Sequence, residues 1–200
     1  MQNPDNPVSR AVEPVARLLS IAIGWGILAF SLALTAEIIG RKLFGTSFKG
    51  MDELGGFLLA IAAAAGASYT MALRGHTRVD VFLVKFSQRA QRFLNTLALI
   101  ALASFAVFAA WRAWAVVEDT IEFKSSAPNL DIPLLYPQAV WLLGVALFAA
   151  IASAYALHAV YLLAAGKPGI NSFYGPLSVG EELEGELEAL KDRAGQKANS

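Results

Sequence analysis

Four long runs of mostly apolar residues, each free of charged side chains, divide this chain. They cover residues 18–36, 54–73, 93–111 and 132–166. A helix needs about 20 apolar residues to cross a ~30 Å hydrocarbon core, and each run is close to that length or longer. The last run begins with Pro133 and Pro137, and proline is tolerated in the first turn of a helix. We therefore predict an all-α membrane protein with four transmembrane helices, at about 18–39, 53–73, 93–117 and 137–165.

The composition supports the membrane interpretation. Hydrophobic residues make up 56% of the chain and charged residues 16%, against roughly 45–50% and about 25% in soluble domains. The formal net charge is zero, so no overall field attracts nucleic acid. The absence of cysteine excludes disulfides and thiolate chemistry. We expect no enzyme activity, no cofactor and no metal site in this chain.

The polar remainder lies mainly at the two ends. Residues 1–17 form an N-terminal segment, 18–166 the transmembrane domain, and 167–200 an acidic tail. The tail contains Leu183, Leu187 and Leu190 at helical spacing, which predicts a short acidic helix. The first apolar run exceeds the roughly 7–15 residues of a signal-peptide core, so we expect it to be a retained span.

Basic residues predict the orientation. The second connection between apolar runs holds five of them, Arg74, Arg78, Lys85, Arg89 and Arg92, whereas the third holds only Lys124. Because cytoplasmic loops are enriched in Lys and Arg, both termini should be cytoplasmic, in a multi-pass protein of the cytoplasmic membrane. Aromatic residues then gather near the outer interface, as expected for amphipathic rings: Trp111, Trp114, Tyr136 and Trp141.

Charged residues at the ends of the apolar runs are the main candidates for function. Glu37 and Arg41 stand four residues apart on the first helix, a spacing that allows an ion pair on one face. Asp52 and Glu53 open the second helix, where acids complement the helix dipole. Both sets can also serve as contacts for a partner protein. They would lie together at the outer face.

One cation and two histidines lie in or beside the spans. Arg112 directly follows the third apolar run, and it can reach the surface or pair with Glu37, Glu118 or Asp119. His76 and His158 both fall near the inner face, where two histidines could hold a haem. We favour a hydrogen-bonding loop residue for His76 and a packed helical residue for His158.

No apolar run has a polar cluster at its centre, and no polar Gly/Pro interruption marks a solute site. The second run instead carries small residues at helical spacing, Ala60, Ala64 and Ser68. Small residues allow membrane helices to approach closely. The chain therefore has the features of a packing surface for other helices.

Several segments, taken in order, resemble one family. They are EIIGRKLF at 37–44, the acidic pair at 52–53, YTMALRGHTRVD at 69–80, and the loop with Ser125, Ala127, Leu130, Ile132 and Pro133. This order is similar to that in the small, Q-type (DctQ-like) membrane subunit of TRAP transporters, the tripartite ATP-independent periplasmic family. The resemblance covers roughly residues 15–166; the acidic tail lies outside it.

The resemblance implies a supporting role in transport. The small subunit scaffolds a large multi-helix membrane subunit, which moves an organic acid delivered by a periplasmic binding protein. A sodium gradient drives uptake, with sodium coupling in the large subunit. The resemblance also implies a bacterial or archaeal cytoplasmic membrane. We assign partner-interface or structural roles to a set of polar positions and one glycine: Glu37, Arg41, Asp52, Glu53, Arg74, Gly75, His76, Asp80 and Arg112.

Three other functions stay open. A four-helix scaffold or assembly protein outside transport fits the same apolar pattern. A haem-binding oxidoreductase subunit would use the two histidines. A small multidrug-type exporter would need a carboxylate in the middle of a span, whereas Glu37 lies at the end of one.

Overall fold

The computed structural model contains four long helices and one short one. It describes residues 6–45, 48–72, 83, 86–167, 169–175, 187, 190 and 191. The helices are α1 (Pro7–Phe44), α2 (Met51–Ala72), α4 (Gln88–Phe123), α5 (Leu135–Ala164) and α6 (Ile170–Tyr174). The first four are long and apolar enough to cross a membrane, which confirms the predicted all-α class with four helices able to span a bilayer.

The helices extend beyond the charge-free runs. The helix α1 begins at Pro7 rather than near residue 18, and α4 covers Gln88–Phe123 rather than about 93–117. Local caps account for the added turns: Asn6 accepts a hydrogen bond from the Val8 amide, and Ser87 accepts one from the Ala90 amide. The charge-free runs delimit the apolar part of each helix, whereas the caps set its ends.

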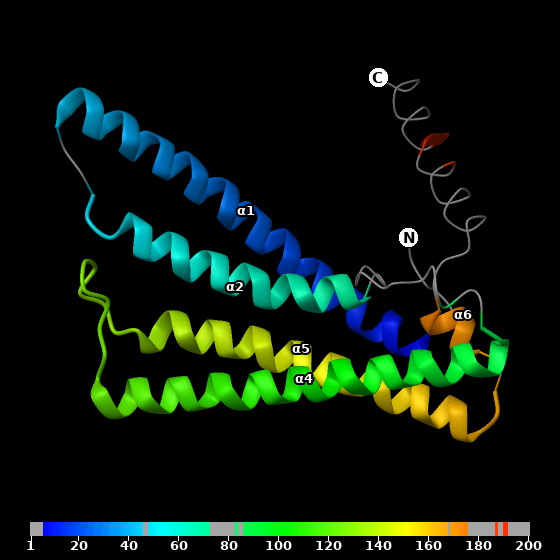
Figure 1. Ribbon diagram of the computed structural model, residues 1–200. Helices are drawn as coiled ribbons and strands as arrows, with labels where there is room; N and C mark the ends of the chain where they lie inside the picture. Colours follow the sequence, from blue (N-terminus) through cyan, green and yellow to red (C-terminus); the bar gives the residue numbers. More distant parts are fainter. Residues whose placement is uncertain are drawn as a thin grey trace.

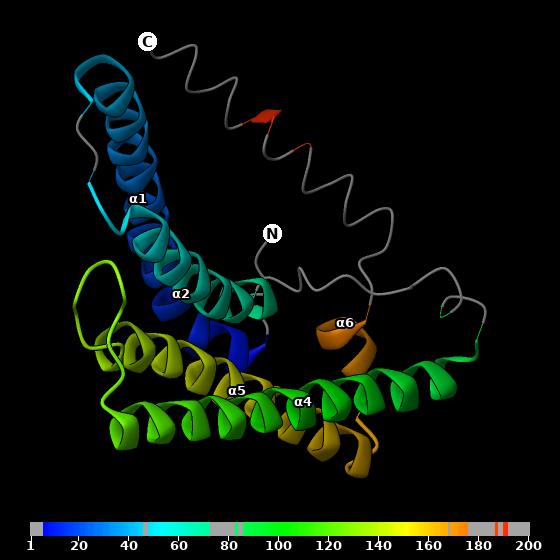
Figure 2. The same cartoon turned by 60° about the vertical axis from the view of Figure 1, so that its left-hand side comes forward.

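Two hairpins make up the fold (Figure 1). One hairpin is α1–α2 and the other is α4–α5, and α2 lies between α1 and α5. The connection between α1 and α2 lies at the same end of the molecule as that between α4 and α5. The turned view shows α1 leaning away from α4 (Figure 2). The end of α1 near the α1–α2 connection therefore has α2 as its main neighbour among the described helices.

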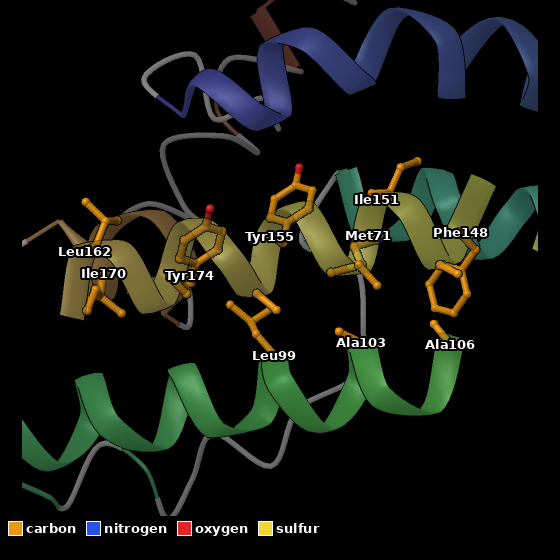
Figure 3. Packing of buried hydrophobic residues seen from close by; sticks show 14 residues of the cluster. Met71, Leu99, Ala103, Ala106, Phe148, Ile151, Tyr155, Leu162, Ile170 and Tyr174 are labelled. Carbon is orange, nitrogen blue, oxygen red and sulfur yellow. The ribbon is translucent and has the colours of Figure 1, made fainter. Parts of the chain in front are cut away.

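The core lies between α4 and α5, with contributions from α2 and α6. Leu99 and Ala106 of α4 face α5, with Ala106 next to Phe148 (Figure 3). Tyr155 of α5 points toward α1, and Met71 of α2 belongs to the same cluster. Ala106, Ala152 and Ala159 are completely buried. Alanine adds little bulk, so the two backbones can approach closely, which is the usual basis of helix association in lipid.

Small residues also join α2 to α5. A Cβ placed on Gly144 would lie 3.0 Å from the Ala64 Cβ, and Ala64 and Ser68 are buried. Two of the three small residues singled out on the second span thus lie inside this chain. Ala60, in contrast, is exposed. The buried part of the small-residue set binds α2 within the subunit and is not available to a separate protein.

The helix α6 was not predicted. It packs against α4 and α5 and brings Ile170 and Tyr174 into the core. Residues 169–175 therefore belong to the packed domain, although the sequence analysis assigned them to the tail. Of the predicted acidic helix, only Leu187, Leu190 and Lys191 are among the described residues.

Replacing Gly144 with leucine should separate α2 from α5. The new side chain has no room beside Ala64, and overpacking a core typically costs about 1–3 kcal/mol. Gly66→Leu is the matched control, because nothing lies within 4 Å of a Cβ built there. Thermal unfolding of the detergent-solubilised chain, followed by tryptophan fluorescence, should show a lower midpoint for Gly144→Leu alone. Equal midpoints would contradict the close packing.

Candidate functional site at the connected helix ends

The predicted ion pair on α1 is present. Glu37 Oε1 lies 3.9 Å from Arg41 Nε, with the Glu37 side chain 5% exposed and that of Arg41 59% exposed. The carboxylate therefore faces the protein, and the guanidinium remains accessible. The helix ends at Phe44. The next residue, Gly45, caps it with a left-handed φ of 68°, and the Gly45 amide donates a hydrogen bond to the Arg41 carbonyl. Arg41 is the member of the pair that a partner can reach.

The two acids at the start of α2 differ in their surroundings. Asp52 is exposed. The Glu53 carboxylate accepts hydrogen bonds from the Asn129 amide (3.1 Å), the Asn129 side-chain nitrogen (2.9 Å) and the Leu130 amide (3.2 Å). Hydrogen bonds to a charged group are stronger than neutral ones. Glu53 thus fastens the α4–α5 connection to α2, a contact that the sequence analysis missed.

Gly50, just before α2, also lets the α4–α5 connection pack closely against the start of α2. Its φ is +88°, and a Cβ there would lie 2.4 Å from the Leu130 Cγ. Any other residue would be both strained in this left-handed conformation and too close to Leu130. The two connections at this end of the molecule therefore form one joined surface.

The α4–α5 connection is itself ordered by backbone hydrogen bonds. The Ala127 amide donates to the Ile132 carbonyl, and the Leu134 amide donates to the Ser125 carbonyl. Lys124 and Asp131 have positive φ values of 47° and 52°, and Ala127 is buried. The connection is a closed turn that Glu53 can hold as a unit.

Arg112 does not make the ion pairs that the sequence suggested. Within the described part of the chain, it pairs with none of Glu37, Glu118 and Asp119. Its guanidinium carbon lies 5.8 Å from the centre of the Trp111 ring, within the range of a cation–π contact. Glu118 and Asp119 stand six and seven residues further along α4, beyond the three- or four-residue spacing at which side chains on a helix normally pair.

His158 is a packed helical residue, as expected. Its Nδ1 is hydrogen-bonded to the Tyr174 hydroxyl, and its ring lies beside Phe173 and Tyr174 of α6. Nearby, the hydroxyls of Ser9 and Tyr155 lie 2.7 Å apart and join α1 to α5. No group of three or more potential metal ligands occurs among the described residues.

The remaining candidates belong to the segment after α2. Arg74, Gly75, His76 and Asp80 lie outside the described residues. The candidates that are described fall at two kinds of position. Glu37, Arg41, Asp52 and Glu53 lie on the connected ends of α1 and α2, and Arg112 lies on α4.

Removing the Glu53 carboxylate should loosen the joined surface. Glu53→Ala leaves the Asn129 and Leu130 amides without their acceptor, at an expected cost of about 1–2 kcal/mol for partly exposed, charge-assisted bonds. Hydrogen exchange at residues 125–134 should become faster. Asp52→Ala removes a neighbouring acid that makes none of these bonds and should leave exchange unchanged. Faster exchange in both variants would point to a general charge effect instead.

The comparisons with known proteins identify the family. The chain matches the family described as "Tripartite ATP-independent periplasmic transporters, DctQ component" over residues 30–162. The match begins within α1, includes α2 and α4, and ends in the last turn of α5. A search of curated proteins found no match. The chain therefore belongs to the DctQ family of small membrane components of TRAP transporters, a transporter family and not an enzyme family.

Proposed function

We propose that this chain scaffolds the large, substrate-translocating subunit of a TRAP transporter during sodium-driven uptake of an organic acid. Membership of the DctQ family is the observation that carries the proposal. In this role a periplasmic binding protein supplies the substrate, and the large subunit holds the coupling ions. The chain itself provides helices that fix the large subunit in a bacterial or archaeal cytoplasmic membrane.

The surface of α1 supports a scaffolding role. No residue of its most apolar 18-residue window is buried in this chain. Leu18, Trp25 and Leu32 are 69%, 68% and 65% exposed. Their spacing of seven residues keeps them on one face of the helix, so they form a continuous apolar stripe. We assign this stripe to contact with the large subunit.

Another side of α1 packs against α2. Gly26 lies near Leu58 of α2, and Phe30 lies near Gly55. The stripe therefore faces away from the chain's own helices. Arg41 is exposed near the end of the same helix, half a turn around α1 from Leu32, and we propose that it contacts a polar part of the large subunit.

Cross-linking from α1 tests the proposal. The chain has no cysteine of its own, so Leu32→Cys can carry a single benzophenone label. In native membranes the label should join this chain to a much larger membrane protein. Leu97→Cys on α4 is the control, since it is exposed but lies outside the stripe and should give little protein cross-linking. Cross-links from Leu97 alone would overturn the assignment, and their absence from both positions would remove support for the partner.

The orientation is a second testable part of the proposal. With both termini cytoplasmic, Lys49→Cys in the α1–α2 connection should react with an impermeant thiol reagent added to cells with a permeable outer envelope. Arg89→Cys, at the start of α4, should react only after the membrane is opened. The reverse labelling pattern would invert the proposed topology.

A further inference from the structure

A groove on the membrane-facing side of α4 and α5 has no role in the proposed scaffold. Its volume is about 660 Å³. The walls come only from these two helices and are almost wholly apolar, including Ile100, Val107, Phe108 and Trp111 of α4 and Leu157 and Val160 of α5. Leu157 is 71% exposed. The groove is thus open to whatever surrounds the two helices.

The groove runs along α4 for about half the thickness of a bilayer's hydrocarbon core. On α4 it extends from Ile100 to Trp111, which is about 16 Å at 1.5 Å per residue. Half of a ~30 Å hydrocarbon core is about 15 Å. The charge-free run of α4 ends at Trp111, about 9 Å short of the end of the predicted span at residue 117, so a long side chain at this end of the groove can extend to the boundary between hydrocarbon and head groups.

A cation stands at that end of the groove, and its long side chain can extend toward the boundary. The Arg112 guanidinium lies over the ring of Trp111, which is itself part of the groove wall. Arg112 is exposed, and no described carboxylate pairs with it. An unpaired guanidinium at head-group depth is suited to a phosphate, which it can bind through two parallel hydrogen bonds. The groove and the cation together have the shape and charge of a phospholipid site.

Two acids lie beyond the cation on the same helix. Asp119 follows Arg112 by seven residues, which places it on the same face about 10 Å further out. Both Glu118 and Asp119 are exposed. A head group carrying an amine outside its phosphate would meet complementary charge at both positions. This arrangement favours a zwitterionic lipid over a purely anionic one.

We propose that α4 and α5 bind one ethanolamine-type glycerophospholipid from the leaflet on the side of the α4–α5 connection. One acyl chain occupies the groove, and the phosphate contacts Arg112. The site depends on the membrane location of the helices and not on the transport role. Its failure would therefore leave the proposed function standing.

Native mass spectrometry with added phosphatidylethanolamine tests the site, using the full chain with any bound partner. The unmodified chain should retain one lipid. Arg112→Gln should weaken binding at least tenfold, equivalent to about 1.4 kcal/mol, whereas Lys124→Gln should change it less than twofold. Diacylglycerol with the same acyl chains lacks the phosphate and should bind as weakly to the unmodified chain as the phospholipid binds to Arg112→Gln. Equal effects of the two substitutions would overturn the phosphate contact.

A groove-filling substitution tests the acyl-chain part independently. Ser104 lines the groove from an exposed position on α4, and Ser104→Phe should abolish lipid retention. Ala98→Phe adds similar bulk at an exposed position outside the groove and should have no effect. A photoreactive residue at Leu157 should label lipid in native membranes. Labelling of a protein alone would overturn the proposal and assign the groove to a helix of a partner.

Discussion

The close approach of α4 to α5 is the contact on which the rest of the structure depends. In lipid, helices gain little from the hydrophobic effect, so association relies on packing and on buried hydrogen bonds. The completely buried alanines at 106, 152 and 159 let these two backbones come close over much of their length. The α2 and α6 helices pack against this α4–α5 hairpin, and α1 packs mainly against α2.

Polar contacts secure this arrangement at both ends, outside its apolar centre. At one end, Glu53 and Gly50 hold the α4–α5 connection against the start of α2. At the other, Tyr155 meets Ser9, and Asn171 of α6 meets Asn95 of α4. Each contact joins segments that are far apart in the sequence. These polar contacts at the helix ends therefore fix the relative positions of the helices, because apolar faces alone select poorly between alternative packing partners.

The subunit leaves its two exposed apolar features on different helices. The stripe on α1 is continuous and is left exposed by the described part of the chain, as expected for a surface that meets another large apolar body. The groove between α4 and α5 is concave, with walls from two helices, and has Arg112 beside one end. This difference in shape and charge is why we assign a protein partner to the first and a lipid to the second.

The sequence by itself determined the features that depend on residues close to one another along the chain. Charge-free runs gave the four spans, because the bilayer demands about 20 apolar residues in succession, and the Glu37–Arg41 pair followed from helical periodicity. Only the tertiary structure decided that Glu53 binds Asn129, 76 residues away, that α6 returns to the core, and that Ala64 of α2 lies against Gly144 of α5. It also placed Arg112 beside Trp111, with no carboxylate of the described residues paired to it. These features arise from packing between distant segments, and no local pattern of residues specifies which of many apolar faces will meet.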